Sequence, residues 1–160
     1  MRFLSMASVL LAVFYALYLP FTQTGLFTTY LEALAQVSGA ILNLWNQDVN
    51  VVGQAMSANG FSLKVVGGCD GLEATALFAA AVAGAPVAWR RRLWCLLLGI
   101  PILAAVNLLR IISLFYLGVY RPEWVDRLHM EVWPAVLIIL VVSGWVLWAR
   151  WAWKQEGFAT

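Results

Sequence analysis

Apolar residues gather in four long runs that are separated by shorter polar stretches. The runs cover residues 3–19, 72–88, 93–119 and 130–151. An α-helix needs roughly 17 to 25 predominantly apolar residues to cross the hydrocarbon core of a bilayer, and each run meets that requirement. The pattern therefore predicts about four transmembrane helices. For residues 3–19 a cleaved signal peptide is the alternative, but the apolar core is long and no small-residue cleavage site follows closely.

Residues 26–45 follow a different pattern. Apolar side chains recur at intervals of three and four from Phe27 to Trp45, while polar ones such as Glu32 and Gln36 fall mainly on the other side. This periodicity predicts an amphipathic helix that lies on the outer membrane surface. A further spanning helix is the alternative.

Residues 48–66 lack helical periodicity. The runs 49–52 and 61–66 are rich in residues that favour strands, and Asn59-Gly60 between them is a turn signal. We expect a small β-hairpin outside the membrane.

Composition supports a membrane location. Of the 160 residues, 63% are hydrophobic and only 11% are charged, so a soluble domain would have too little polar surface to cover itself. Nine Trp and five Tyr suit a protein with two membrane interfaces. We expect one domain over residues 1–160, an all-α integral membrane protein with the lipid bilayer as a partner. The few basic residues argue against nucleic-acid binding.

The positive charges predict the orientation. Cytoplasmic segments of membrane proteins carry an excess of Lys and Arg, and the strongest cluster here is Arg90, Arg91 and Arg92. Arg2, Arg150 and Lys154 agree with it if the N-terminus is cytoplasmic. Residues 26–66 and the segment before residue 130 then lie on the outer face.

The segment Gly67-Gly68-Cys69-Asp70-Gly71-Leu72-Glu73 marks the change from polar chain to apolar helix. Unpaired N–H groups at a helix start favour an anion and lower the pKa of a thiol there. Asp70 and Glu73 oppose this effect, so Cys69 requires a cation from elsewhere in the chain. Cys95 lies in an apolar run and indicates core packing; because the two cysteines lie on opposite membrane sides, we expect no disulfide.

Two further residues are expected at the level of Cys69. Arg110 lies inside an apolar helix, where a charge costs at least ~2.5 kcal/mol, so it should face the bundle or a wet cavity; bridging two helices is the alternative. Asn107, one turn earlier, could orient its guanidinium. His129 is the only histidine and precedes the last apolar run; a capping role is the alternative. Arg121 and Arg127 are expected to be interfacial or to bind a substrate carboxylate.

Together Cys69, Arg110 and His129 suit acyl transfer. The thiolate would attack a peptide carbonyl, His129 would transfer protons, and Arg110 would stabilise the oxyanion or position the substrate. We expect no cofactor. One histidine and one outer cysteine are too few ligands for a closed zinc site.

Three motifs resemble the exosortase/archaeosortase family. They are Cys69-Asp70-Gly71 at the start of a membrane helix, Asn107-Leu108-Leu109-Arg110-Ile111 late in the next one, and His129 before the last. The resemblance covers residues 67–150 and points to a compact member, of the exosortase H type.

The resemblance implies a membrane-embedded cysteine transpeptidase or peptidase. Its substrates would be exported proteins with a C-terminal sorting signal, made of a short signature, one transmembrane helix and a basic tail. Cys69 would be the nucleophile, His129 the proton-transfer residue and Arg110 the transition-state arginine. We expect a bacterial inner-membrane protein with its active site on the periplasmic face; the acceptor nucleophile stays open.

Two other functions compete with this interpretation. A lipoprotein signal peptidase also has four spanning helices and uses two outer aspartates, for which Asp48, Asp70 and Asp126 are available, but its helix motifs are missing. A non-enzymatic membrane scaffold would use the alanine-rich helix for packing and Arg110 as a bridge. It would tolerate substitution of Cys69 and His129, whereas an enzyme would not.

Overall fold

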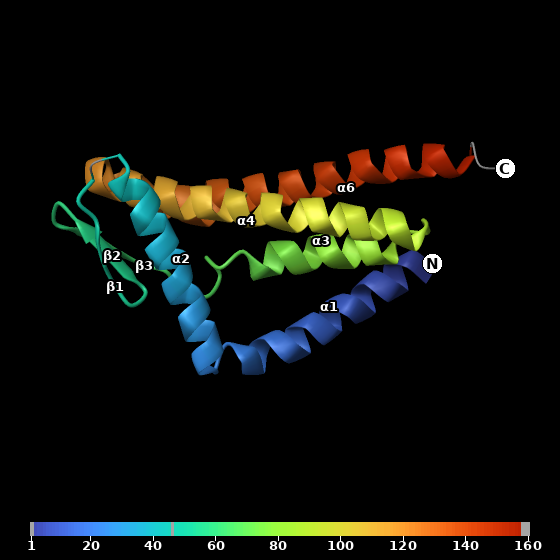
Figure 1. Ribbon diagram of the computed structural model, residues 1–160, viewed down its shortest axis with the longest axis horizontal. Coiled ribbons are helices and arrows are strands. Elements are labelled where there is room, and N and C mark those ends of the chain that lie inside the picture. Colours follow the sequence, from blue (N-terminus) through green and yellow to red (C-terminus); the bar gives the residue numbers. More distant parts are fainter. Residues whose placement is uncertain (1, 46, 158–160) are drawn as a thin grey trace.

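The computed structural model describes residues 2–45 and 47–157, with side chains placed for residues 8–45 and 47–155. Figure 1 shows α3 (Leu72–Gly84), α4 (Trp89–Tyr120) and α6 (Trp133–Gly157) side by side, with α1 (Arg2–Phe21) inclined to them. The shortest of them, α3, contacts α1, α4 and α6 and is therefore the centre of the helical part.

The predicted count of about four transmembrane helices is not confirmed. Within the described residues, the segments Trp89–Tyr120 and Pro122–Gln155 are long and apolar enough to span, and a bent helix pair would make a third. The α3 helix has 13 residues, or about 20 Å at 1.5 Å per residue, which is less than the hydrocarbon thickness. It stops short of residue 88 because Ala85 precedes Pro86 and is extended, with ψ 135°.

The amphipathic segment forms α2 (Gly25–Asn43), which leaves the axis of α1 at 91°. Thr24 caps it, since its side-chain oxygen accepts a hydrogen bond from the backbone N–H of Phe27. Its buried face includes Leu31, Ala35 and Leu42, whereas Val37 and the terminal Trp45, which the periodicity places on the apolar face, are exposed. The helix runs across the ends of the long helices (Figure 1), a course that suits an amphipathic surface helix.

The predicted hairpin is a three-stranded antiparallel sheet. Its strands are β1 (Asn50–Val52), β2 (Ala55–Ala58) and β3 (Phe61–Lys64), in that spatial order. The turn at Asn59-Gly60 is confirmed, with φ of 51° and 80° as a type I′ turn requires. The middle strand β2 could not be predicted from the sequence, because none of its residues, Ala55-Met56-Ser57-Ala58, is β-branched or aromatic.

The sheet and α2 pack on the C-terminal half of α4. The main core contains Leu31 from α2, Met56 from β2, and Ile111 and Phe115 from α4. The rings of Phe61 and Phe115 meet edge to face at 5.8 Å and hold β3 against α4. A second cluster joins α3, α4 and α6 farther along; Cys95 packs against it, as predicted.

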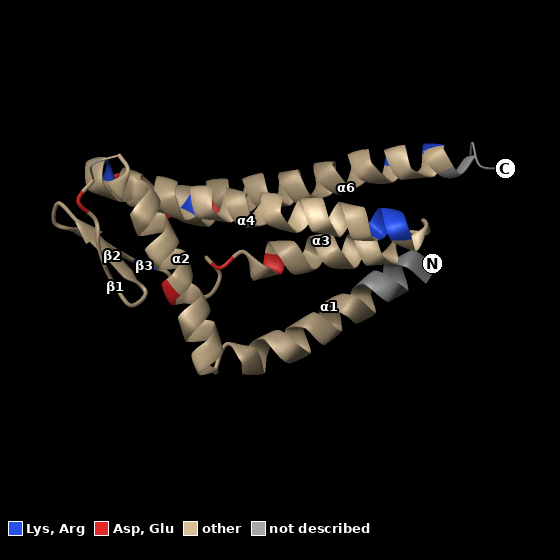
Figure 2. Cartoon of the chain, viewed as in Figure 1, with Lys and Arg blue, Asp and Glu red and all other residues tan. Residues whose placement is uncertain are grey.

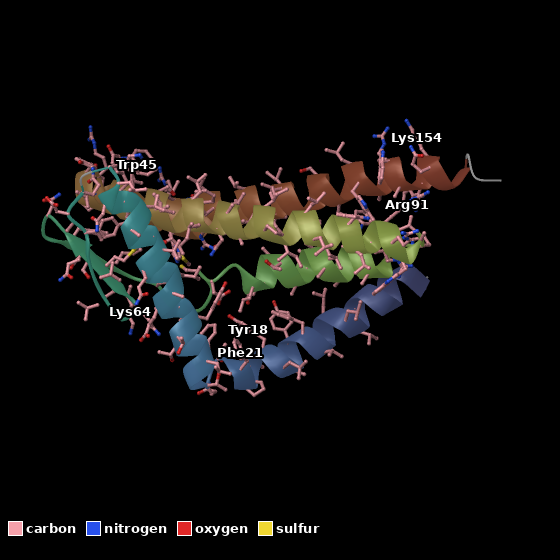
Figure 3. All side chains as sticks on the ribbon, in the orientation of Figure 1. Tyr18, Phe21, Trp45, Lys64, Arg91 and Lys154 are labelled. Carbon is pink, nitrogen blue, oxygen red and sulfur yellow. The ribbon has the colours of Figure 1, made fainter. Side chains whose placement is uncertain are left out.

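The basic cluster lies at the far end of the molecule from the sheet. Helix α4 begins before it, so these arginines belong to the first turn of α4 rather than to a loop. Arg92 donates hydrogen bonds to the carbonyl oxygens of Ala83 and Val87 and thereby closes the end of α3. Figure 2 shows basic residues gathered at this end, and Figure 3 places Arg91 and Lys154 there. Arg150, another predicted charge marker, is exposed in α6, and Arg2 falls outside the described side chains.

The polar composition of residues 120–128 predicts a loop before His129, but residues 122–128 are helical instead. A 3₁₀ turn η1 (Pro122–Trp124), a single α-turn α5 (Val125–Arg127) and a π-helix η2 (Leu128–Val132) lead without a break into α6. The π-helix contains His129. Such π-helical turns are rare and are frequent at functional sites.

Candidate active site

The cysteine lies in the loop between β3 and α3, whose shape depends on glycine. Gly68 and Gly71 have φ of 86° and 77°, in the left-handed region that glycine adopts at little cost. At Gly71 a Cβ atom would also come within 2.8 Å of the Asn107 side chain. The loop can therefore approach α4 closely only with glycine at this position, and Cys69 is held between the two turns.

Asp70 organises the loop from inside. Its carboxylate accepts hydrogen bonds from the N–H of Leu72 at 2.7 Å, the N–H of Gly68 at 3.2 Å and the hydroxyl of Tyr18 at 2.8 Å. The Tyr30 hydroxyl donates to the Asp70 carbonyl oxygen at 2.8 Å. With a side chain only 2% exposed, Asp70 joins the start of α3 to α1 and α2.

This anchor was not predicted from the sequence. In the sequence, Asp70 suggests only a charge that opposes the thiolate, because it directly follows the cysteine. Tyr18 and Tyr30 resemble ordinary interfacial aromatic residues. The position of Asp70, two residues before the helical Leu72, could have indicated this role, because an aspartate at a helix start commonly accepts backbone hydrogen bonds. Asp48 and Asp126 are both exposed, so Asp70 alone of the three outer aspartates is buried.

Two side chains of α4 hold the same loop by its carbonyl groups. Asn107 donates from Nδ2 to the Cys69 oxygen at 2.9 Å, and Arg110 donates from Nη1 to the Gly68 oxygen at 3.1 Å. The expectation that Asn107 orients the Arg110 guanidinium is corrected, because the Asn107 amide donates to the cysteine loop and the hydrogen bonds of the guanidinium go to Gly68 and His129. Asn107 therefore positions Cys69.

Cys69, His129 and Arg110 come together. The sulfur of Cys69 lies 3.7 Å from both Nδ1 and Nε2 of His129, and Nη2 of Arg110 lies 3.5 Å from Nδ1. The three residues come from the loop before α3, from η2 and from α4, which are remote in sequence. The arrangement can pass a proton between a thiol and an imidazole beside a fixed positive charge.

Burial dominates the electrostatics of the thiol. Cys69 is 8% exposed, and this burial raises the pKa of its thiol above the ordinary value, although the Arg110 guanidinium lowers it. The Asp70 carboxylate raises the pKa further. The expected lowering at a helix start is thus outweighed by desolvation, and the resting thiol keeps its proton near neutral pH.

Arg110 is a buried cation with spare hydrogen-bonding capacity. It is 5% exposed, and its Nε has no hydrogen-bond partner. Within the described part of the chain, no carboxylate lies within ion-pair distance of it. A buried, uncompensated guanidinium favours any negative charge that develops beside it.

Two cavities adjoin the site. The helix cavity, of about 350 Å³, lies among α1, α3 and α6, with Asp70, Glu73 and Arg110 at its polar end. The sheet cavity, of about 120 Å³, lies between the end of β3, α4 and α5, and is lined by both Cys69 and His129. Cys69 and His129 line the sheet cavity, whereas Arg110 lines the helix cavity.

The remaining predicted candidates lie apart from this cluster. Arg121 is exposed and pairs with Glu123 at 3.7 Å, while Arg127 lies over the Trp124 ring at 5.5 Å. Among the described residues, no group of three His, Cys, Asp or Glu side chains has the arrangement of a metal site.

Comparison with known families agrees with the sequence resemblance. The family model described as transmembrane exosortase (Exosortase_EpsH) matches residues 2–132, a range that contains Cys69, Arg110 and His129. No curated protein and no solved structure gave a significant match. Because the matched range covers most of the 160 residues, the chain belongs to the transmembrane exosortase family.

Proposed function

We propose that the protein is a membrane-embedded cysteine transpeptidase or peptidase that cleaves a C-terminal sorting signal from membrane-tethered proteins. The observation that carries this proposal is the contact of the Cys69 sulfur with both ring nitrogens of His129, beside Arg110. Membership of the exosortase family supports a sorting function in the membrane.

Cys69 acts as the nucleophile and His129 as the base that activates it. Since the raised pKa leaves the thiol protonated, attack requires that the thiol proton pass to the imidazole as sulfur bonds to the scissile carbonyl carbon. Collapse of the tetrahedral intermediate breaks the C–N bond, and His129 gives the proton to the departing amine. A thioester on Cys69 remains; water or an amine then attacks it and restores the thiol.

Arg110 stabilises the negative oxygen that forms in each tetrahedral intermediate. Its guanidinium can only donate hydrogen bonds, and one N–H, at Nε, is unused and buried. A fixed cation in a site this dry stabilises developing charge more strongly than it would in water. The same charge favours the thiolate over the thiol.

We further infer that the site faces the periplasm of a bacterial inner membrane. The Arg90–Arg92 cluster and Lys154 mark one end of the long helices, and the sheet lies at the other (Figures 2 and 3). Cytoplasmic ends of membrane helices are the basic ones, so the sheet end is the outer end. The substrate's tether would then cross the bilayer beside the enzyme.

Co-expression with a tagged reporter tests the function. The reporter carries a candidate signature, a transmembrane helix and a basic tail, and it is compared with wild type, Cys69→Ala and Cys95→Ala. We expect wild type and Cys95→Ala to shorten the reporter and Cys69→Ala to leave it full length. Processing by Cys69→Ala at the wild-type rate would exclude Cys69 as the nucleophile.

A further inference from the structure

The third strand of the sheet has a free edge. The strand order β1-β2-β3 leaves β3 without a neighbour on one side, and Val65 donates to the Gln54 oxygen on the other side at 2.9 Å. Hydrogen-bonded and non-hydrogen-bonded residues alternate along an antiparallel strand, so the N–H and C=O groups of Ser62 and Lys64 point away from β2. No residue of the described chain bonds them.

This free edge leads directly to the cysteine. Residues 63–66 line the sheet cavity together with Cys69 and His129. Leu63 and Lys64, the last two residues of β3, have side chains on opposite faces of the strand, and both border this cavity, so the backbone at the end of β3 lies beside it. An extended peptide paired with this backbone would therefore end at the thiol.

The volume of the sheet cavity limits what enters it. At about 120 Å³ the cavity is well below the roughly 300–1,000 Å³ of pockets that enclose a whole small ligand. It has room for one side chain and not for a peptide. The main chain of a bound peptide must then lie along the rim, where β3 offers unpaired hydrogen-bonding groups.

The two cavities also indicate the direction of the peptide. In the proposed substrate, the transmembrane helix follows the scissile bond, and it must remain among lipid and membrane helices. The helix cavity is lined mostly by apolar residues of α1, α3 and α6, such as Leu11, Leu77 and Val141, and it suits that part. The acyl part, which precedes the scissile bond, is left for the sheet side.

We propose that the substrate residues preceding the scissile bond bind in extended form along the free edge of β3, as a fourth strand, with one side chain in the sheet cavity. This inference rests on the proposed function. Strand addition supplies affinity through main-chain hydrogen bonds and leaves specificity to the side chain that enters the cavity.

A proline substitution in the edge strand tests the proposal. Ser62→Pro removes an outward N–H without breaking a bond to β2, because Ser62 and Ser57 form a non-hydrogen-bonded pair. Ser62→Ala also loses the hydroxyl but keeps the N–H. The probe is a reporter that the wild-type protein cleaves and the Cys69→Ala variant does not. If no such reporter is found, the proposed function has failed, and this result is separate from any result on the strand edge.

We expect cleavage of the reporter by Ser62→Pro to be about tenfold slower than by Ser62→Ala, as for the loss of one hydrogen bond and the added bulk of the ring. Alkylation of Cys69 by iodoacetamide, in a Cys95→Ala background, should proceed equally in both, which shows an intact site. Equal cleavage by the two variants would overturn the inference while leaving the cysteine mechanism in place.

A crosslink keeps the proposal falsifiable if the proline variant misfolds. A photoreactive amino acid replaces the exposed Lys64 in a Cys69→Ala protein, which binds the reporter without cleaving it. Mass spectrometry should place the adduct on reporter residues before the scissile bond. Strand addition on β3 would be excluded if the adducts were confined to the reporter's transmembrane helix. It would also be excluded if a photoreactive residue at position 64 gave no adduct while one at Leu77 did.

Discussion

At the scale of single residues, the site separates chemistry from positioning. Cys69, His129 and Arg110 meet through their reactive groups, whereas Asp70 and Asn107 hold the backbone that carries the thiol. The proximity of the three reactive residues could be predicted from the sequence because the helices place them at one level, and the acyl transfer proposed for the site requires these residue types. The positioning residues could not be predicted, since their partners are backbone groups whose location depends on the folded loop.

The raised pKa of Cys69 predicts how its alkylation depends on pH. Iodoacetamide reacts with the thiolate, so in a Cys95→Ala protein the rate should climb as pH rises above neutral, with a midpoint above that of an ordinary cysteine. Arg110→Met removes the cation that lowers this pKa, and its profile should shift to higher pH. Arg121→Met removes an exposed arginine and should leave the profile in place. A downward shift for Arg110→Met would contradict the assigned electrostatics.

At the scale of elements, the long helices were easier to predict than the short pieces. Helical apolar runs are decided by many residues together: α1, α4 and α6 lie on the predicted apolar runs and α2 lies on the predicted amphipathic segment, with ends that differ by a few residues. The β2 strand and the helical turns from Pro122 to Val132 are set by packing instead: Met56 is fully buried although its neighbours have low strand propensity. Their short lengths leave no periodicity to detect.

The turn that begins α3 is the most sensitive element of the site. Gly71→Ala adds a Cβ to a left-handed residue, and this atom would lie 2.8 Å from the Asn107 side chain, so the substitution should displace the cysteine loop and abolish processing. Gly60→Ala is the matched control: its φ is similarly positive, but nothing lies within 4 Å of the added atom.

We expect Gly60→Ala to cost only the backbone strain, about 1–2 kcal/mol. Thermal unfolding in detergent, followed by circular dichroism, should show a larger loss for Gly71→Ala than for Gly60→Ala. Comparable melting and comparable reporter cleavage in the two variants would show that the contact with Asn107 does not hold the loop.

At the scale of the whole molecule, the fold places Cys69, His129 and Arg110 toward the sheet and the Arg90–Arg92 cluster at the opposite end (Figure 3). The membrane character and the family could be predicted from composition and short motifs, and the family is confirmed. The number of spans could not, because α3 has an apolar composition but ends at Gly84, and because a bend of 91° joins α1 to α2. Hydrophobicity fixes which segments avoid water but not where each helix stops.

The orientation of these two ends can be measured by thiol labelling in intact cells. In a protein without Cys69 and Cys95, a single cysteine is placed at the exposed Glu123 in η1, at the sheet end of the molecule, or at Lys154, at the basic end (Figures 1 and 3). A membrane-impermeant maleimide should label Glu123→Cys from outside and should reach Lys154→Cys only after lysis, because basic ends face the cytoplasm. The reverse pattern would put the thiol on the cytoplasmic side, where an enzyme that sorts exported proteins would not meet its substrates.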